Sequence, residues 1–150
     1  MRHRQEGQIL VLFALGLLTI MAFVGLAVDG ARLFQAHLSA QVLADEAANA
    51  AAQQLDISPD SALRRGEPPE LVTGKGAGSA YAAADSYLLE RVTDRHTRWS
   101  IEAMPREVDV TIERDVDMAF FQALGLGTQT VAAQGFATPL SGILSPDPHP

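Results

Sequence analysis

Residues that could perform catalysis or bind a metal ion are few in this sequence and are not grouped. The four histidines occupy positions 3, 37, 96 and 149, and the chain has no cysteine. Zinc and similar metals need histidine and cysteine ligands at short, paired spacings, which are missing here. The sequence therefore predicts no metal centre of that kind and no bound cofactor.

Two glycine-rich segments also lack the spacing that their chemistry would need. Gly74-Lys75-Gly76 is not a phosphate-binding loop, because the GxxxxGK[ST] spacing is missing and no strand precedes it. The segment that follows, Gly76-Ala77-Gly78-Ser79-Ala80, lacks the second glycine of a nucleophile elbow. We therefore expect no enzymatic activity.

Four carboxylates lie on one side of an expected strand: Asp109, Glu113, Asp115 and Asp117. Alternate residues of a strand share a face, so this is the pattern of a solvent-exposed strand face. A calcium site is the alternative interpretation, although the residues lack the compact loop that calcium sites use.

The element that must position everything else is an uncharged run of twenty residues, from Ile9 to Val28. A helix rises about 1.5 Å per residue, so the run spans ~30 Å, the thickness of a bilayer's hydrocarbon core. We predict a transmembrane helix at 9–28. A cleaved secretory signal is the alternative, but the apolar part of such signals is typically about 7–15 residues. Gly16 and Gly25 do not form a GxxxG pair, so the run gives no strong signal for a dimer and an ordinary lipid-facing anchor is favoured.

The charges that flank the run predict its orientation. Residues 1–8 form a short basic head with Arg2 and Arg4, whereas Asp29 follows the run directly. The positive-inside rule then places the N-terminus in the cytoplasm and the rest of the chain outside.

Residues 29–55 are predicted to continue as an exported, alanine-rich helix. With the span, this helix would contain about 48 residues and be ~72 Å long. Alanine recurs at every fourth position of one helix face, at Ala36, Ala40, Ala44, Ala48 and Ala52. Such a ridge lets another helix approach closely, so it is a candidate contact surface. Alternatively, alanine is simply a good helix former on an ordinary surface.

The remaining residues predict a linker and a small domain. Residues 56–78 are rich in proline and glycine and are expected to form an exposed loop. Residues 79–138 predict a short helix, two alternating strands around Met104-Pro105-Arg106, an apolar plug at Phe120 and Phe121, and a weaker third strand. The tail at 139–150 is expected to be disordered. The fold class is α+β, a long N-terminal helix packed on a small antiparallel sheet, as in a pilin.

Composition limits the partners. The net charge is −7, which argues against nucleic acid because phosphate binding needs a clustered basic face. The partners we expect are membrane lipid and other proteins.

The first fifty residues resemble the opening of the TadE/TadG family of pilus-assembly proteins. The residues that carry the resemblance are Gly7-Gln8, the uncharged span, Val28-Asp29, Arg32-Leu33-Phe34 and Ala44-Asp45-Glu46-Ala47-Ala48. The later order of an alternating strand, Phe120-Phe121 and a small-residue strand is also similar.

The resemblance implies a membrane-anchored minor pilin or assembly factor of the bacterial tight-adherence (Flp) system, without catalytic activity. Its partners would be pilins or other pilus-assembly proteins, with self-association through the long helix as a further mode. A single-pass exported binding or sensor module for an envelope ligand is the alternative function.

The resemblance also raises the question of processing. A pilin-type peptidase would cut between Gly7 and Gln8. TadE-like sequences that are processed typically have a glutamate five positions after that glycine, where this chain has Leu12. The segment is therefore more similar to TadG, and we predict that the head is retained.

Overall fold

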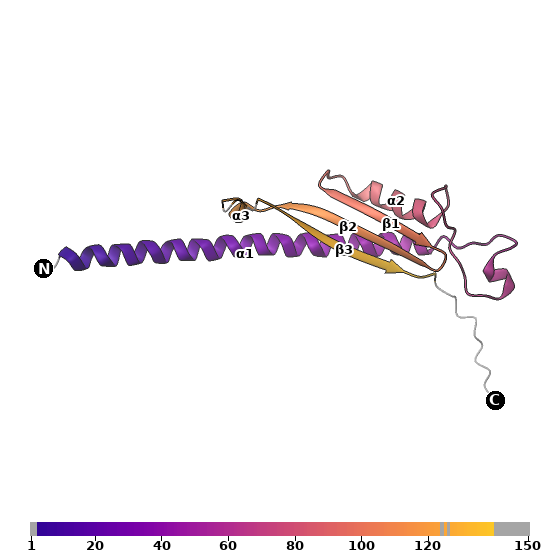
Figure 1. Ribbon diagram of the computed structural model, residues 1–150, viewed down its shortest axis with the longest axis horizontal. Coiled ribbons are helices and arrows are strands. Elements are labelled where there is room, and N and C mark those ends of the chain that lie inside the picture. The colour runs from indigo at the N-terminus through magenta and orange to yellow at the C-terminus, as the bar shows by residue number, and fades with distance from the viewer. Residues whose placement is uncertain (1–2, 124, 126, 140–150) are drawn as a thin grey trace, which may run out of the picture. The chain divides into compact units, whose positions relative to one another are not determined.

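The computed structural model describes residues 3–123, 125 and 127–139. Its elements are α1 (His3–Ala52), η1 (Ala62–Arg65), α2 (Ala80–Arg91), β1 (Thr97–Met104), β2 (Glu107–Asp117), α3 (Ala119–Ala123) and β3 (Thr128–Ala137) (Figure 1). The strands form one antiparallel sheet in the order β1-β2-β3, and the long N-terminal helix packs against it. The predicted α+β class is confirmed.

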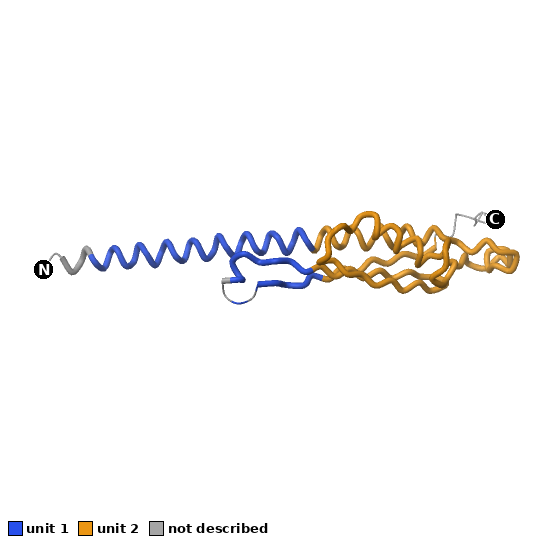
Figure 2. The backbone as a smooth tube through the Cα atoms, turned by 90° about the horizontal axis from the view of Figure 1, so that it is seen from above, with its two compact units in different colours: residues 1–36, 115–131 blue, residues 37–114, 132–150 orange. Residues whose placement is uncertain are grey.

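The chain divides into two compact units, which are coloured separately in Figure 2. Unit 1 comprises residues 1–36 and 115–131, and unit 2 comprises residues 37–114 and 132–150. Each unit therefore takes one part of α1 together with parts of β2 and β3. We describe the two separately.

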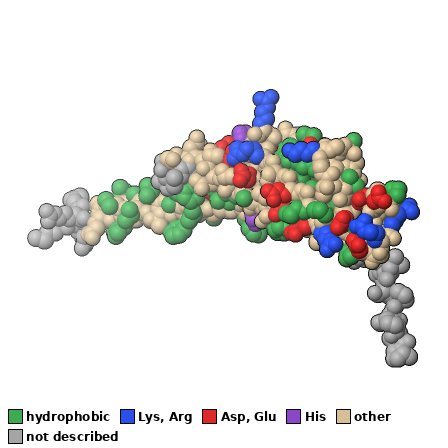
Figure 3. All heavy atoms as spheres, turned by 45° about the vertical axis from the view of Figure 1, so that its right-hand side comes forward, with side chains coloured by type: hydrophobic (Ala, Val, Ile, Leu, Met, Phe, Trp, Pro, Cys, Tyr) green, Lys and Arg blue, Asp and Glu red, His purple; other side chains and the backbone are tan. Residues whose placement is uncertain are grey.

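Unit 1 contains the apolar part of α1. Its large side chains from Ile9 to Val28 are between 46 % and 73 % exposed, so none of them is buried by the described residues. The single hydroxyl in this run, on Thr19, donates to the carbonyl oxygen of Leu15 at 2.8 Å and so has a partner within the helix. On the face that Figure 3 shows, the described N-terminal part of α1 carries hydrophobic side chains and no charged ones. This helix is long and apolar enough to cross a membrane.

Unit 2 contains the main hydrophobic core. Strands β1 and β2 pair in the register Ile101↔Val110, so alternate β2 side chains point inward and Val108, Val110 and Ile112 are fully buried. The core is completed by Leu88 of α2 and by small residues of α1 and β3. The expected hairpin is confirmed, as is the helix that starts after Ser79, whose side chain accepts from the N–H of Ala82 at 3.1 Å.

Strand β3 lies directly on the backbone of α1 within unit 2. A Cβ atom added to Gly135 would lie 2.4 Å from the carbonyl carbon and oxygen of Ala44. Ala44 itself is fully buried. Glycine on the strand and alanine on the helix therefore let the two backbones approach closely.

The segment predicted as an exposed linker is more ordered than expected. Helix α1 ends at Ala52, and Leu55 then forms an antiparallel bridge with Leu71, which is only 3 % exposed. The N–H of Leu71 donates to the carbonyl of Pro105 at 2.7 Å, which joins the segment to the β1–β2 turn. Proline and glycine predicted a loop but could not show that Leu71 would be part of the core. The expected disorder at 139–150 concerns 140–150, which lie outside the described residues.

The close approach at Gly135 predicts a specific sensitivity. In Gly135→Ala the new methyl group meets backbone atoms, which cannot move aside as a flexible side chain would. We expect the free energy of unfolding to fall by about 1–3 kcal/mol, the usual cost of overpacking. Denaturation of the detergent-solubilised protein measures this. Gly76→Ala is the matched control, because nothing lies within 4 Å of its added Cβ. Equal stability of the two variants would contradict the assignment.

Candidate functional site

The most specific polar arrangement in unit 1 joins α1 to α3. The side chain of Asp29 is fully buried although it directly follows the apolar run. Its Oδ1 accepts from the backbone N–H of Ala119 at 3.0 Å, and its Oδ2 accepts from those of Phe120 at 2.7 Å and Phe121 at 3.0 Å. The first N–H groups of a helix have no partner within it, so a carboxylate is a suitable acceptor for them. Asp29 thus fixes α3 to the side of α1.

An apolar contact lies one helical turn before Asp29. A Cβ atom on Gly25 would lie 2.3 Å from Cδ2 of Phe120, so the ring rests on the bare helix backbone. The Phe120 and Phe121 rings pack edge to face with their centroids 6.2 Å apart. The helix surface at Gly25 is therefore covered by Phe120. Gly16 has nothing within 4 Å of its added Cβ, as expected of an open surface.

The segment that carries α3 is closed by its own hydrogen bonds. The N–H of Met118 donates to the carbonyl of Gly127 at 2.8 Å, and the N–H of Gly125 donates to that of Gln122 at 3.1 Å. Gly125 has φ of 83°, which favours glycine. Cross-strand pairs lie beside it, since the Thr128 and Thr130 hydroxyls donate to Asp117 and Asp115 at 3.2 and 2.7 Å. We call the described residues of this segment, 118–123, 125 and 127, the α3 turn.

The alanine ridge lies largely inside unit 2. Ala40, Ala44 and Ala48 are buried in the core of the chain itself, while Ala36 and Ala52 are partly buried. The described structure therefore gives the middle of this ridge an intramolecular neighbour.

The residues of the candidate cleavage site, which we predict to remain uncut, lie on exposed helix. Gly7 and Gln8 are within α1 and exposed, and Leu12, on the same helix, is 61 % exposed.

The four strand carboxylates do not converge on one point. Asp117 and Asp115 accept from the hydroxyls of Thr128 and Thr130. Of the others, Asp109 accepts from the Gln134 amide at 2.5 Å and Glu113 pairs with Arg98 at 3.7 Å. Each therefore has its own cross-strand partner. Among the described residues, no group of three or more histidine or carboxylate side chains is placed to hold a metal ion.

A polar network in unit 2 joins α1, β2 and the segment before β1. The Arg114 guanidinium donates to the hydroxyls of Thr97 at 3.0 Å and Ser39 at 2.9 Å, and to Asp94 at 2.7 Å. Burial raises the pKa of Asp94, but hydrogen bonds from Thr97 and Arg114 and the charge of Arg114 outweigh it. The pKa of Asp94 therefore lies below its usual 3.8, and the group is ionised at neutral pH.

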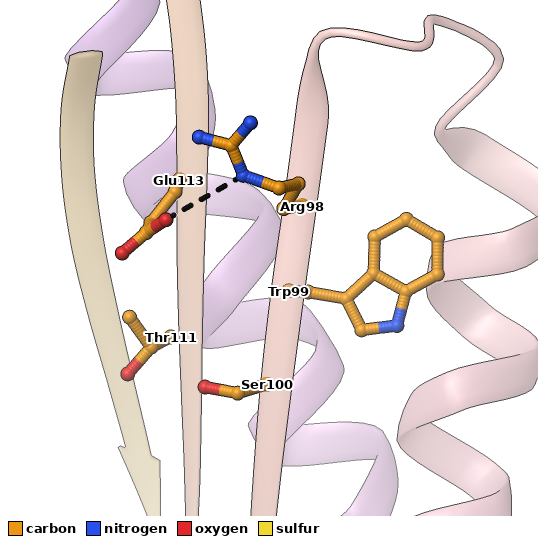
Figure 4. Close-up of a pocket in the computed structure, with 5 residues that line it drawn as sticks. All are labelled: Arg98, Trp99, Ser100, Thr111 and Glu113. Carbon is orange, nitrogen blue, oxygen red and sulfur yellow. Dashed lines mark ion pairs between the residues drawn. The ribbon is translucent and has the colours of Figure 1, made fainter.

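A shallow cavity of about 140 Å³ lies on the β1–β2 hairpin (Figure 4). It is lined by Arg98, Trp99, Ser100, Thr111 and Glu113. The indole of Trp99 points towards α2, where its Nε1 donates to Asp85 at 3.0 Å. Ligand pockets usually measure about 300–1,000 Å³, so this cavity is too small for a typical organic ligand.

Comparison with known proteins gives one finding about identity. Residues 7–54 match the family model described as Flp pilus-assembly, TadE/G-like. The match covers about a third of the chain and nearly all of α1, including Gly25 and Asp29. Searches of the curated proteins and of the solved structures each found no match.

Sequence reasoning missed the role of Asp29. It used the residue only as a charge that marks the end of the span, whereas the structure makes it the partner of α3. The available signal was an acid directly after a long apolar run, together with an uncharged Phe-Phe segment later in the chain. Neither feature indicates that Asp29 would accept hydrogen bonds from the Phe-Phe segment.

Asp29→Asn tests the attachment of α3. Asparagine keeps the size but removes the charge and leaves only one acceptor oxygen, so the three N–H groups cannot all be satisfied. We expect amide hydrogen exchange to become faster at residues 119–121 and to stay unchanged at the buried residues of β1 and β2. Asp45→Asn, an exposed carboxylate on the same helix, is the control. Unchanged protection at 119–121 would show that Asp29 does not hold the turn.

Proposed function

We propose that this protein is a membrane-anchored, TadE/G-like component of a tight-adherence (Flp) pilus system that acts by protein–protein contact. The observation that carries the proposal is the family match over residues 7–54. An exposed apolar helix at the same residues supports an anchoring role.

The geometry of unit 2 supports contact rather than chemistry. A groove of about 690 Å³ at the ends of α1 and β3 is lined by Asn49, Ala52, Gln53, Leu55, Phe136, Ala137 and Thr138. None of these side chains is ionisable, so the groove offers no general acid or base. Because the middle of the alanine ridge is buried, we assign the partner contact to the exposed surface of unit 2.

The charges that flank the apolar run and the residue at position 12 bear on orientation and processing. We propose that residues 9–28 span the bacterial cytoplasmic membrane, with the basic head inside and the chain from Asp29 outside. Leu12 supports a TadG-like protein that keeps Arg2 to Gly7 and remains in the membrane as an assembly factor. A buried charge is costly without a partner, so a helix lacking the acid suits permanent anchoring.

Capture of the intact protein from detergent-solubilised membranes tests the contact role. We expect pilins or platform components of the same pilus system to copurify with the wild type and with Gly76→Ala. Gly135→Ala should retain less of them, because it destabilises the exported domain and leaves the anchor unchanged. Recovery of a soluble envelope ligand without any pilus protein would favour the sensor function instead.

One proteolysis experiment tests orientation and processing together. Trypsin added outside right-side-out membranes should cut at the exposed Arg64 or Arg65. The intact mass of the fragment left in the membrane then gives its N-terminus, which we expect to precede Gly7. Protection of this site would reverse the orientation, and a fragment that starts at Gln8 would show that the head is cleaved.

A further inference from the structure

The α3 turn lies beside the last part of the apolar run, within unit 1. Phe120 rests on Gly25, which is three residues before Val28, the last residue of the run. At about 1.5 Å per residue, this contact lies ~5 Å inside the end of the apolar segment. If the run fills the hydrocarbon core, the turn is at the depth where acyl chains meet headgroups.

The composition of the turn fits that depth. The sequence has no ionisable side chain between Asp117 and Asp147, and Gln122 is the only polar side chain at 118–127. The two phenylalanine rings are only partly buried by the described residues, so they retain apolar surface without a neighbour. Ala119 and Gln122 are exposed at the same turn.

Five backbone N–H groups of the turn meet the condition that lipid imposes. Irregular backbone is costly near hydrocarbon unless its polar groups have partners. Here the three N–H groups at the start of α3 donate to Asp29, and those of Met118 and Gly125 donate within the turn. A carboxylate, rather than a water molecule, thus satisfies the helix start.

We infer that the α3 turn is a second membrane contact, which inserts Phe120 and Phe121 into the interfacial region of the outer leaflet beside the anchor helix. The occupant of its exposed apolar surface is lipid, because the surface is continuous with that of the span. The inference rests on the membrane anchoring in the proposed function. The contact fixes α1 at two points, the span and the turn, and so restricts how the anchor tilts and rotates in the bilayer.

The absence of cysteine makes the test direct, because a single introduced cysteine can carry a spin label. Gln122→Cys keeps both phenylalanine rings, and the full-length labelled protein is reconstituted into phosphatidylcholine vesicles. Collisions with dissolved oxygen report lipid, and collisions with a water-soluble nickel complex report water. We expect the ratio of oxygen to nickel accessibility at position 122 to exceed that at Gln129→Cys on β3. Ala119→Cys is a second variant in case the label at 122 disturbs the turn.

The controls separate this inference from the anchoring proposal. Leu18→Cys, at the middle of the apolar run, should be oxygen-accessible and shielded from nickel. If Leu18 behaves so while positions 119 and 122 match Gln129, the turn lies in water and the inference is wrong. The same holds if 119 and 122 are shielded from both reagents in a way that depends on protein concentration, which would indicate a second copy. If the Leu18 label itself meets nickel, the membrane anchoring fails as well.

Discussion

The backbone N–H groups that open α3 cannot be satisfied inside a helix of five residues, and Asp29 supplies their acceptor. The carboxylate is buried by the same contact that it makes. Its burial is tolerable because both oxygens accept hydrogen bonds. Removing the turn would leave the carboxylate without its three donors, and removing the carboxylate would leave those three N–H groups without their acceptor. Each part of unit 1 therefore depends on the other.

Absent side chains are as important to the packing as present ones. Gly25 admits the Phe120 ring in unit 1, and Gly135 admits the α1 backbone in unit 2. At the Gly135 contact, the residues of α1 are alanines, whose small side chains let the strand approach the helix backbone. A core built this way gains less from burying large side chains, so it relies on a few of them, among which Leu88 and Ile112 are fully buried. Close backbone approach compensates by increasing dispersion contact along the whole interface.

The elements could be predicted from the sequence because their signals are local. The apolar run, the alternation from Val108 to Ile112 and the cap at Ser79 each require only neighbouring residues to be recognised. The contacts of Gly25 and Asp29 could not, because their partners are about 90 residues away in the chain. Glycine in a span is equally consistent with lipid, and an acid after it with a simple boundary. The roles of Gly25 and Asp29 depend on where the Phe-Phe segment lies after β2, and its position is a property of the tertiary structure.

The two parts of α1 differ in composition and in burial. From Ile9 to Val28 the helix carries no charge and is apolar on all sides apart from Thr19, a composition that suits a lipid environment. From His37 to Ala52 the buried face consists of alanine, which suits a helix covered on one side by a sheet, whereas Leu38 and Val42 remain exposed. The backbone nevertheless continues as one helix through both parts. Asp29 lies close to this change. At that point a partner from the chain itself, the α3 turn, replaces the solvent that an acid would otherwise need.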